Sequence, residues 1–178
     1  MKMKATVPKV TLWTINSILA LAGLVVMNIY VLRTCKQCVF FGHIQEVERI
    51  FTSGSMIWCM FIMSGCFVSF GTGLVVLLGE FRKFKNVSMS FFNQSSNFLI
   101  LRASLLWTFL AAIVSAVGFF TWCQSFKVNS CFKNASQDWH AFTPKHSDCF
   151  GASAWQILLN VFLWGSFLLQ SLSWFHYL

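Results

Sequence analysis

Long apolar stretches alternate with short polar ones along the whole chain. Four stretches contain no charged residue, and they cover residues 10–32, 50–79, 103–126 and 149–178. An α-helix needs about 20 mainly apolar residues to cross the hydrocarbon core of a bilayer, so each stretch is long enough to span a membrane. We therefore predict an all-α membrane protein: a four-helix transmembrane bundle, with spans at about 10–32, 55–79, 98–122 and 152–174, forming one domain over residues 1–178.

Composition and charge support residence in a membrane. Hydrophobic residues make up 57% of the chain and charged residues 10%, whereas a soluble domain has roughly 45–50% and about 25%. The formal net charge is +8, from 13 Lys and Arg residues against 5 Asp and Glu residues. These basic residues lie mainly between the spans, where they meet anionic lipid headgroups, and no compact basic domain is left to bind nucleic acid. We expect membrane lipids as partners and no nucleic acid.

The cysteines indicate which loops face an oxidising compartment. The segments on the two sides of the predicted membrane contain nearly equal numbers of Lys and Arg, and Arg102 gives a slight excess that favours a cytosolic N-terminus. Loops 33–54 and 123–151 contain cysteines, whereas loop 80–97 contains none. Because disulfides persist in oxidising compartments, the first two loops are predicted to be extracellular or lumenal, and loop 80–97 and both termini cytosolic. This places the protein in the secretory pathway or plasma membrane, with Asn134 in an outer loop as a predicted glycosylation site.

Six cysteines lie at or near the outer side in this topology, and fifteen connectivities among them stay open. These disulfide candidates are Cys35, Cys38, Cys59, Cys123, Cys131 and Cys149. Cys35 and Cys38 also have the C-x-x-C spacing of thiol oxidoreductases. An isolated C-x-x-C is a weak signal, so structural disulfides are the favoured interpretation and a membrane redox enzyme the alternative.

Polar side chains within the spans are candidates for hydrogen bonds between helices. These residues are Asn16, Asn28, Gln156, Asn160 and Gln170. Gln156 and Asn160 are four positions apart and so project from one face of a helix. A solute pathway is the alternative, but no acidic residue lies within a span to support it.

Small residues recur every four positions in the second and third spans, where they let helix backbones approach closely. The predicted helix-packing residues are Gly65, Ser69, Gly73, Ala111, Ala112, Ser115 and Ala116. We expect these stripes to form contacts within the bundle, and a docking surface for another membrane protein is the alternative.

Catalytic patterns are otherwise missing from the sequence. There is no Ser/His/Asp set, phosphate-binding glycine loop or pair of carboxylates, and the spacing of the cysteines with His140 and His146 matches no common zinc site. We therefore predict no catalytic residue, no metal and no cofactor.

Residues 113–123 read Ile-Val-Ser-Ala-Val-Gly-Phe-Phe-Thr-Trp-Cys and are followed by Ser130-Cys131. This pattern resembles the transmembrane protein 179 family, and residues 37–41, 88–92 and 155–174 are similar to other parts of it. The resemblance implies a four-span membrane protein without established catalytic activity, whose outer cysteines correspond to Cys38, Cys59, Cys123 and Cys131. Cys35 and Cys149 look like additions to the family pattern, and the longer cytosolic tail usual in the family is missing here.

The leading hypothesis is a non-enzymatic multi-pass membrane protein. It would act as an accessory subunit or organiser, by lateral association with another integral membrane protein or by self-association. A small-solute channel or transporter is the first alternative, and a thiol-disulfide oxidoreductase using Cys35 and Cys38 is the second.

Overall fold

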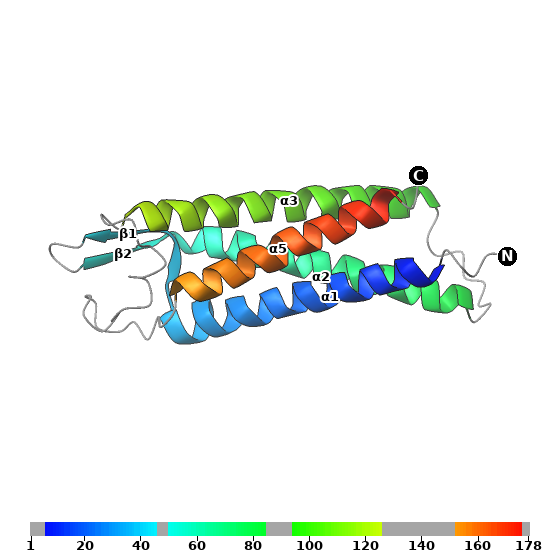
Figure 1. Ribbon diagram of the computed structural model, residues 1–178, viewed down its shortest axis with the longest axis horizontal. Coiled ribbons are helices and arrows are strands. Elements are labelled where there is room, and N and C mark those ends of the chain that lie inside the picture. Colours follow the sequence, from blue (N-terminus) through cyan, green and yellow to red (C-terminus); the bar gives the residue numbers. More distant parts are fainter. Residues whose placement is uncertain (1–5, 46–49, 85–93, 126–151, 176–178) are drawn as a thin grey trace.

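The computed structural model describes residues 6–45, 50–84, 94–125 and 152–175. Its long helices are α1 (Thr6–Met27), α2 (Met56–Phe84), α3 (Gln94–Gln124) and α5 (Ala152–Phe175). They lie along the long axis of the molecule (Figure 1), and each packs mainly against two neighbours in the ring order α1, α2, α3, α5. Each has a segment long and apolar enough to cross a membrane. The predicted four-helix transmembrane bundle is confirmed.

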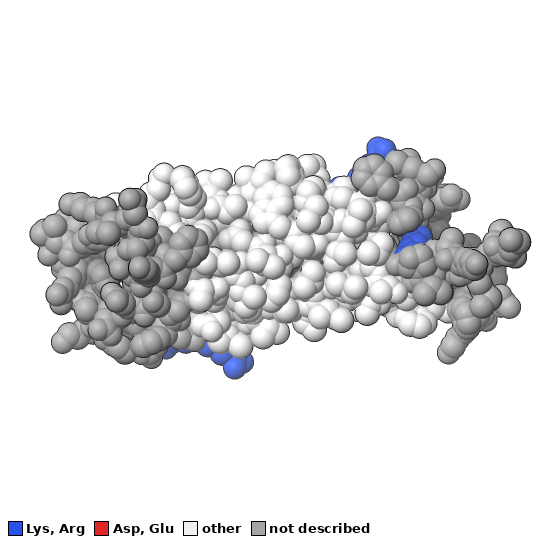
Figure 2. Space-filling model, viewed as in Figure 1, with Lys and Arg blue, Asp and Glu red and all other residues white. Residues whose placement is uncertain are grey.

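The outer surface of the bundle is apolar. Large hydrophobic side chains such as Ile57, Phe67 and Leu99 are exposed, each by more than half of its area. Figure 2 shows no charged side chain on the middle of the visible face, and Lys and Arg side chains lie towards its two ends. An apolar surface of this extent suits lipid and not water. The chain is therefore a multi-pass membrane protein, as predicted.

The first helix is longer than its apolar run. Pro8 lies in the first turn of α1, where its missing N–H breaks no hydrogen bond. Beyond Met27 the helix continues as a π-helix, η1 (Asn28–Cys35). It ends at Lys36, whose φ of 53° is left-handed and stops the helical path.

The chain after η1 forms a β-hairpin of β1 (Cys38–Gln45) and β2 (Ile50–Gly54), which are antiparallel. The sequence alone does not predict this hairpin, because residues 50–54 merge with the apolar run of the second span. The register is irregular between Cys38 and His43, and Phe41 in this stretch has a φ of 59°. Gly54 is required opposite it, since a Cβ there would collide with the backbone of Phe40.

The hairpin covers one end of the bundle (Figure 1). Val39 and Phe40 of β1 are fully buried, and β1 packs against α3. Gly118 of α3 makes room for this contact, because a Cβ there would lie 2.8 Å from the Phe41 ring. Trp155 at the start of α5 packs against Phe40 in a T-shaped arrangement, with a centroid separation of 5.7 Å. We call this region the hairpin end.

The opposite end of the bundle contains an ion pair. Lys9 Nζ of α1 lies 3.4 Å from Glu80 Oε1 of α2, and both side chains are mostly buried. Glu80 can reach Lys9 because α2 continues to Phe84, beyond the span predicted at 55–79. The pair therefore joins the first turns of α1 to the last turns of α2.

Candidate functional site

The structure brings two of the predicted polar residues, Asn16 and Gln170, into one buried cluster. Ser69 of α2 joins them, together with Ser104 and Thr108 of α3. These five side chains come from all four spanning helices, and each is at most 4% exposed. We call this set the polar cluster.

Each member of the polar cluster is hydrogen-bonded to another. Asn16 Nδ2 donates to the Ser69 backbone oxygen at 3.3 Å, and Ser69 Oγ donates to Asn16 Oδ1 at 3.3 Å. Gln170 Nε2 donates to Ser69 Oγ at 2.7 Å and to Thr108 Oγ1 at 3.3 Å. Ser104 Oγ in turn donates to Gln170 Oε1 at 3.3 Å. The cluster thus links α1 to α5 through α2, and α5 to α3 directly.

The chemistry of the polar cluster is that of a helix-joining network. Its side chains are amides and hydroxyls, none of which ionises near neutral pH or acts readily as an acid, base or nucleophile without an activating neighbour. Hydrogen bonds of this kind between membrane helices contribute about 0.6 kcal/mol each. A cavity of about 10 Å³ lies beside Gln170 and Trp13, which is the size of one water molecule. It is too small for a larger solute.

The remaining predicted polar residues lie apart from the polar cluster. Asn28 is exposed at the start of η1. Asn160 Nδ2 donates to the backbone oxygen of Gln156 in its own helix, at 3.0 Å. Gln156 is fully buried, and neither polar atom of its amide has a hydrogen-bond partner among the described residues. These placements do not join the five residues into one pathway.

The predicted helix-packing residues of α2, Gly65, Ser69 and Gly73, face its neighbours. A Cβ on Gly65 would collide with Ala111 of α3, and a Cβ on Gly73 would collide with Ser17 of α1. Ser69 between them belongs to the polar cluster. In α3, Ala111, Ala112 and Ser115 are fully buried, and Ala116 is half-buried. The described stripes thus form contacts inside the bundle.

The cysteines form disulfides at the hairpin end. Cys38 of β1 is bonded to Cys59 of α2, which confirms that the chain contains a disulfide. Cys35 and Cys123 are also disulfide-bonded, and Cys66 is a free, buried thiol. Because Cys38 pairs with Cys59, the C-x-x-C pair does not bond to itself. Cys131 and Cys149 lie outside the described residues, as does the predicted glycosylation site Asn134.

Sequence reasoning missed Ser104 and Thr108. The signal was present, because the two residues are four positions apart and continue the buried face of α3 that contains Ala111, Ala112 and Ser115. Serine and threonine are frequent in membrane helices and often bond to their own backbone, as Thr121 does to Val117. Contact with Gln170 of α5 distinguishes Ser104 and Thr108, which join helices, from residues such as Thr121 that bond to their own helix.

Comparison of the chain with protein-family models, curated proteins and solved structures returned no match. The class of protein therefore follows from the fold and the polar cluster. The chain is a multi-pass membrane protein whose four spanning helices are joined by buried neutral hydrogen bonds and braced at one end by a disulfide.

Proposed function

We propose that this protein is a non-catalytic accessory subunit or organiser that associates laterally with another integral membrane protein. The observation that carries this proposal is the outward side of α2. That helix has two sets of glycines: one is used inside the bundle, and the other lies on its outer surface.

The outer set consists of Gly71 and Gly79, with Val75 between them. A Cβ on either glycine would have no heavy atom within 4 Å, in contrast to the collisions at Gly65 and Gly73. Val75 is exposed, and the three residues recur every four positions over about 12 Å of helix. The two glycines, which lie eight positions apart with open space above them, leave room for the backbone of a second membrane helix. The outer set therefore suits contact with a helix of another protein.

The interior of the bundle supports a non-catalytic role. Its polar cluster is neutral and hydrogen-bonded within itself, and its function is accounted for by helix association. The cysteines of the C-x-x-C sequence are in disulfides and both are buried. A redox enzyme of this type would need an accessible thiolate.

Sidedness is part of the proposal. We place the hairpin end, with its disulfides, in an extracellular or lumenal space, and both termini with the connection between α2 and α3 (residues 85–93) in the cytosol. Glycosidase treatment of protein from cells should shift its mobility, and the shift should be lost in N134Q. Glycans on Asn86 or Asn93, which lie between α2 and α3, would show the reverse topology.

Membership of the transmembrane protein 179 family is also proposed. Two of the four cysteine positions that the resemblance carries over, Cys38 and Cys59, form the disulfide between β1 and α2. This supports the proposal, because two of the positions that the resemblance implies are used together in a structural disulfide.

The test of lateral association is affinity purification of the full chain in mild detergent. A stoichiometric membrane partner should be recovered with the wild type. The double variant G71L/G79L fills the outer glycine set and should reduce recovery at least about tenfold, equivalent to ~1.4 kcal/mol of binding free energy. A103L adds similar bulk at an exposed position of α3 and is the matched control.

Two outcomes would contradict the proposal. A monodisperse monomer with no stoichiometric partner would remove lateral association as the function. Equal recovery with wild type and G71L/G79L would show that the partner contacts another face. Recovery of a second, differently tagged copy of the chain in place of another protein would identify self-association.

A further inference from the structure

A groove runs along the outer surface of the bundle between α3 and α5, with a volume of about 370 Å³. Its lining is apolar except at one residue. The lining residues are Arg102, Leu105, Leu106, Phe109, Phe167 and Trp174. The groove faces outward, so in a membrane it is open to lipid.

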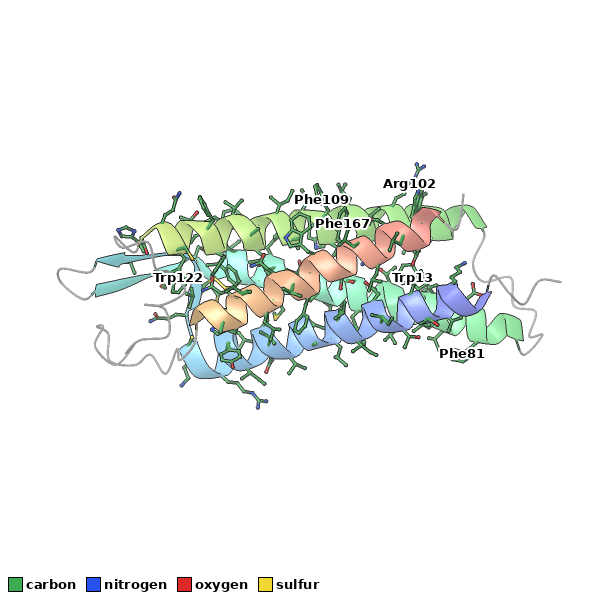
Figure 3. All side chains as sticks on the ribbon, in the orientation of Figure 1. Trp13, Phe81, Arg102, Phe109, Trp122 and Phe167 are labelled. Carbon is green, nitrogen blue, oxygen red and sulfur yellow. A yellow bond between two sulfur atoms is a disulfide. The ribbon has the colours of Figure 1, made fainter. Side chains whose placement is uncertain are left out.

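Aromatic side chains form part of the groove lining. The rings of Phe109 and Phe167 are 4.9 Å apart, and Trp164 meets the edge of Phe109 at 6.1 Å. Figure 3 shows Phe109 and Phe167 side by side between α3 and α5. Leu106 is 59% exposed and forms part of the wall. Leu106, Phe109 and Phe167 give this stretch an apolar lining.

Arg102 lies at one end of the groove. It is exposed, and its guanidinium carbon is 5.1 Å from the centre of the Trp174 ring. It is also close to the beginning of the spanning segment Leu99–Gln124, and Figure 3 shows it near the end of α5, pointing away from the bundle. Arginine and tryptophan at the end of a span both favour the headgroup layer. The two side chains therefore mark the membrane surface.

The spacing along α3 matches the shape of an amphiphile. Seven residues separate Arg102 from Phe109, which is about 10 Å along the helix. A cation thus lies at the headgroup level, and an apolar groove runs from it towards the middle of the membrane. A phospholipid matches this arrangement, because its anionic phosphate lies at the level of Arg102 and its acyl chains extend towards the middle of the membrane.

We propose that this groove binds an anionic phospholipid, with one acyl chain against Phe109 and Phe167 and the phosphate on Arg102. The planar guanidinium donates paired hydrogen bonds that fit phosphate oxygens. Its stacking on Trp174 holds the side chain in place before the lipid arrives. This inference is independent of the outer glycine set on α2.

Native mass spectrometry of the purified full chain tests the proposal. Phosphatidylglycerol and phosphatidylcholine with the same acyl chains serve as probes. The wild type should retain phosphatidylglycerol preferentially, and R102Q should lower its retention about tenfold, because a hydrogen bond to a charged group is lost. R33Q is the matched control, since Arg33 is an exposed arginine of η1 at the other end of the bundle.

A second variant tests the acyl-chain part of the site without touching Arg102. L106W fills the groove from an exposed position and should lower retention of phosphatidylglycerol several-fold. V117W, at a residue of α3 that is 49% exposed and does not line the groove, should leave retention unchanged. Inorganic phosphate alone should not displace the lipid, because it has no chain to fill the groove.

Three results would overturn the proposal. Equal retention by R102Q and R33Q would show that Arg102 does not bind the lipid. Equal retention of the two lipids by the wild type would remove headgroup recognition. Displacement of bound lipid by inorganic phosphate at equal concentration would show a free-anion site and not a phospholipid site.

Discussion

Gln156 and Gln170 lie on the same helix and are both buried, but their surroundings differ. Gln170 uses its amide nitrogen and oxygen to bond Ser69, Thr108 and Ser104 of two other helices. Gln156, near the hairpin end, has no hydrogen-bond partner for either atom among the described residues. The difference lies in what else holds each region together.

At the hairpin end, covalent and aromatic contacts position the helices. Cys38–Cys59 ties the hairpin to α2, and Trp155 stacks on Tyr30 with a centroid distance of 5.5 Å. At the level of Gln170 there is no disulfide among the described residues, and hydrogen bonds link the four helices. Directional polar contacts are therefore needed where shape and covalent bonds do not already fix the register of apolar helices.

The largest effect should come from removing the Cys38–Cys59 disulfide. It closes a segment with a sequence separation of 21 residues, and its loss in C38S/C59S should lower the free energy of unfolding by about 3 kcal/mol. Denaturant unfolding in detergent, without reductant, measures this. C66A alters the free cysteine and should cost clearly less. Equal losses in the two variants would show that the disulfide is not the main brace of the hairpin end.

The next effect concerns the glycines of α2. G65A would drive a methyl group into Ala111 of α3, and the helices would have to separate, at a cost of about 1–3 kcal/mol. G71A adds the same methyl group where nothing lies within 4 Å, and should stabilise the helix by about 0.5–1 kcal/mol. The two variants therefore shift stability in opposite directions. A loss of stability in both would mean that Gly71 is also packed against another helix.

Sequence patterns were sufficient to predict the four spanning helices, because a lipid-facing helix requires a long apolar run whatever it packs against. They did not predict the hairpin, since Val39 and Phe40 are buried by a contact with α3 that is distant in sequence. They also named Asn16 and Gln170 but could not separate them from Asn28, which faces outward. Which side of a mainly apolar helix points inward depends on its neighbours, and large hydrophobic side chains lie on the outer side of each of these four helices.

Replacing Gln170 tests the polar cluster. Q170L removes three hydrogen bonds and leaves the Ser104, Thr108 and Ser69 hydroxyls with fewer partners. At about 0.6 kcal/mol for each bond, we expect a loss of about 1–2 kcal/mol in unfolding free energy. S171A, at a half-buried serine that bonds only to its own helix at Phe167, is the control. A loss no larger than that of S171A would show that the polar cluster does not join the helices.

The smallest effect should have the opposite sign. Q156L places a side chain of similar size where the amide of Gln156 is buried without a hydrogen-bond partner among the described residues. Removing an unsatisfied polar group from an apolar interior should raise the unfolding free energy by up to about 1 kcal/mol. When Q156L and Q170L are measured in the same detergent, the two variants separate the effect of hydrogen bonding on stability from that of burial, because both replace a buried Gln of α5 with Leu. If Q156L destabilises as much as Q170L does, then Gln156 has a polar partner at the hairpin end, and the contrast between the two regions does not hold.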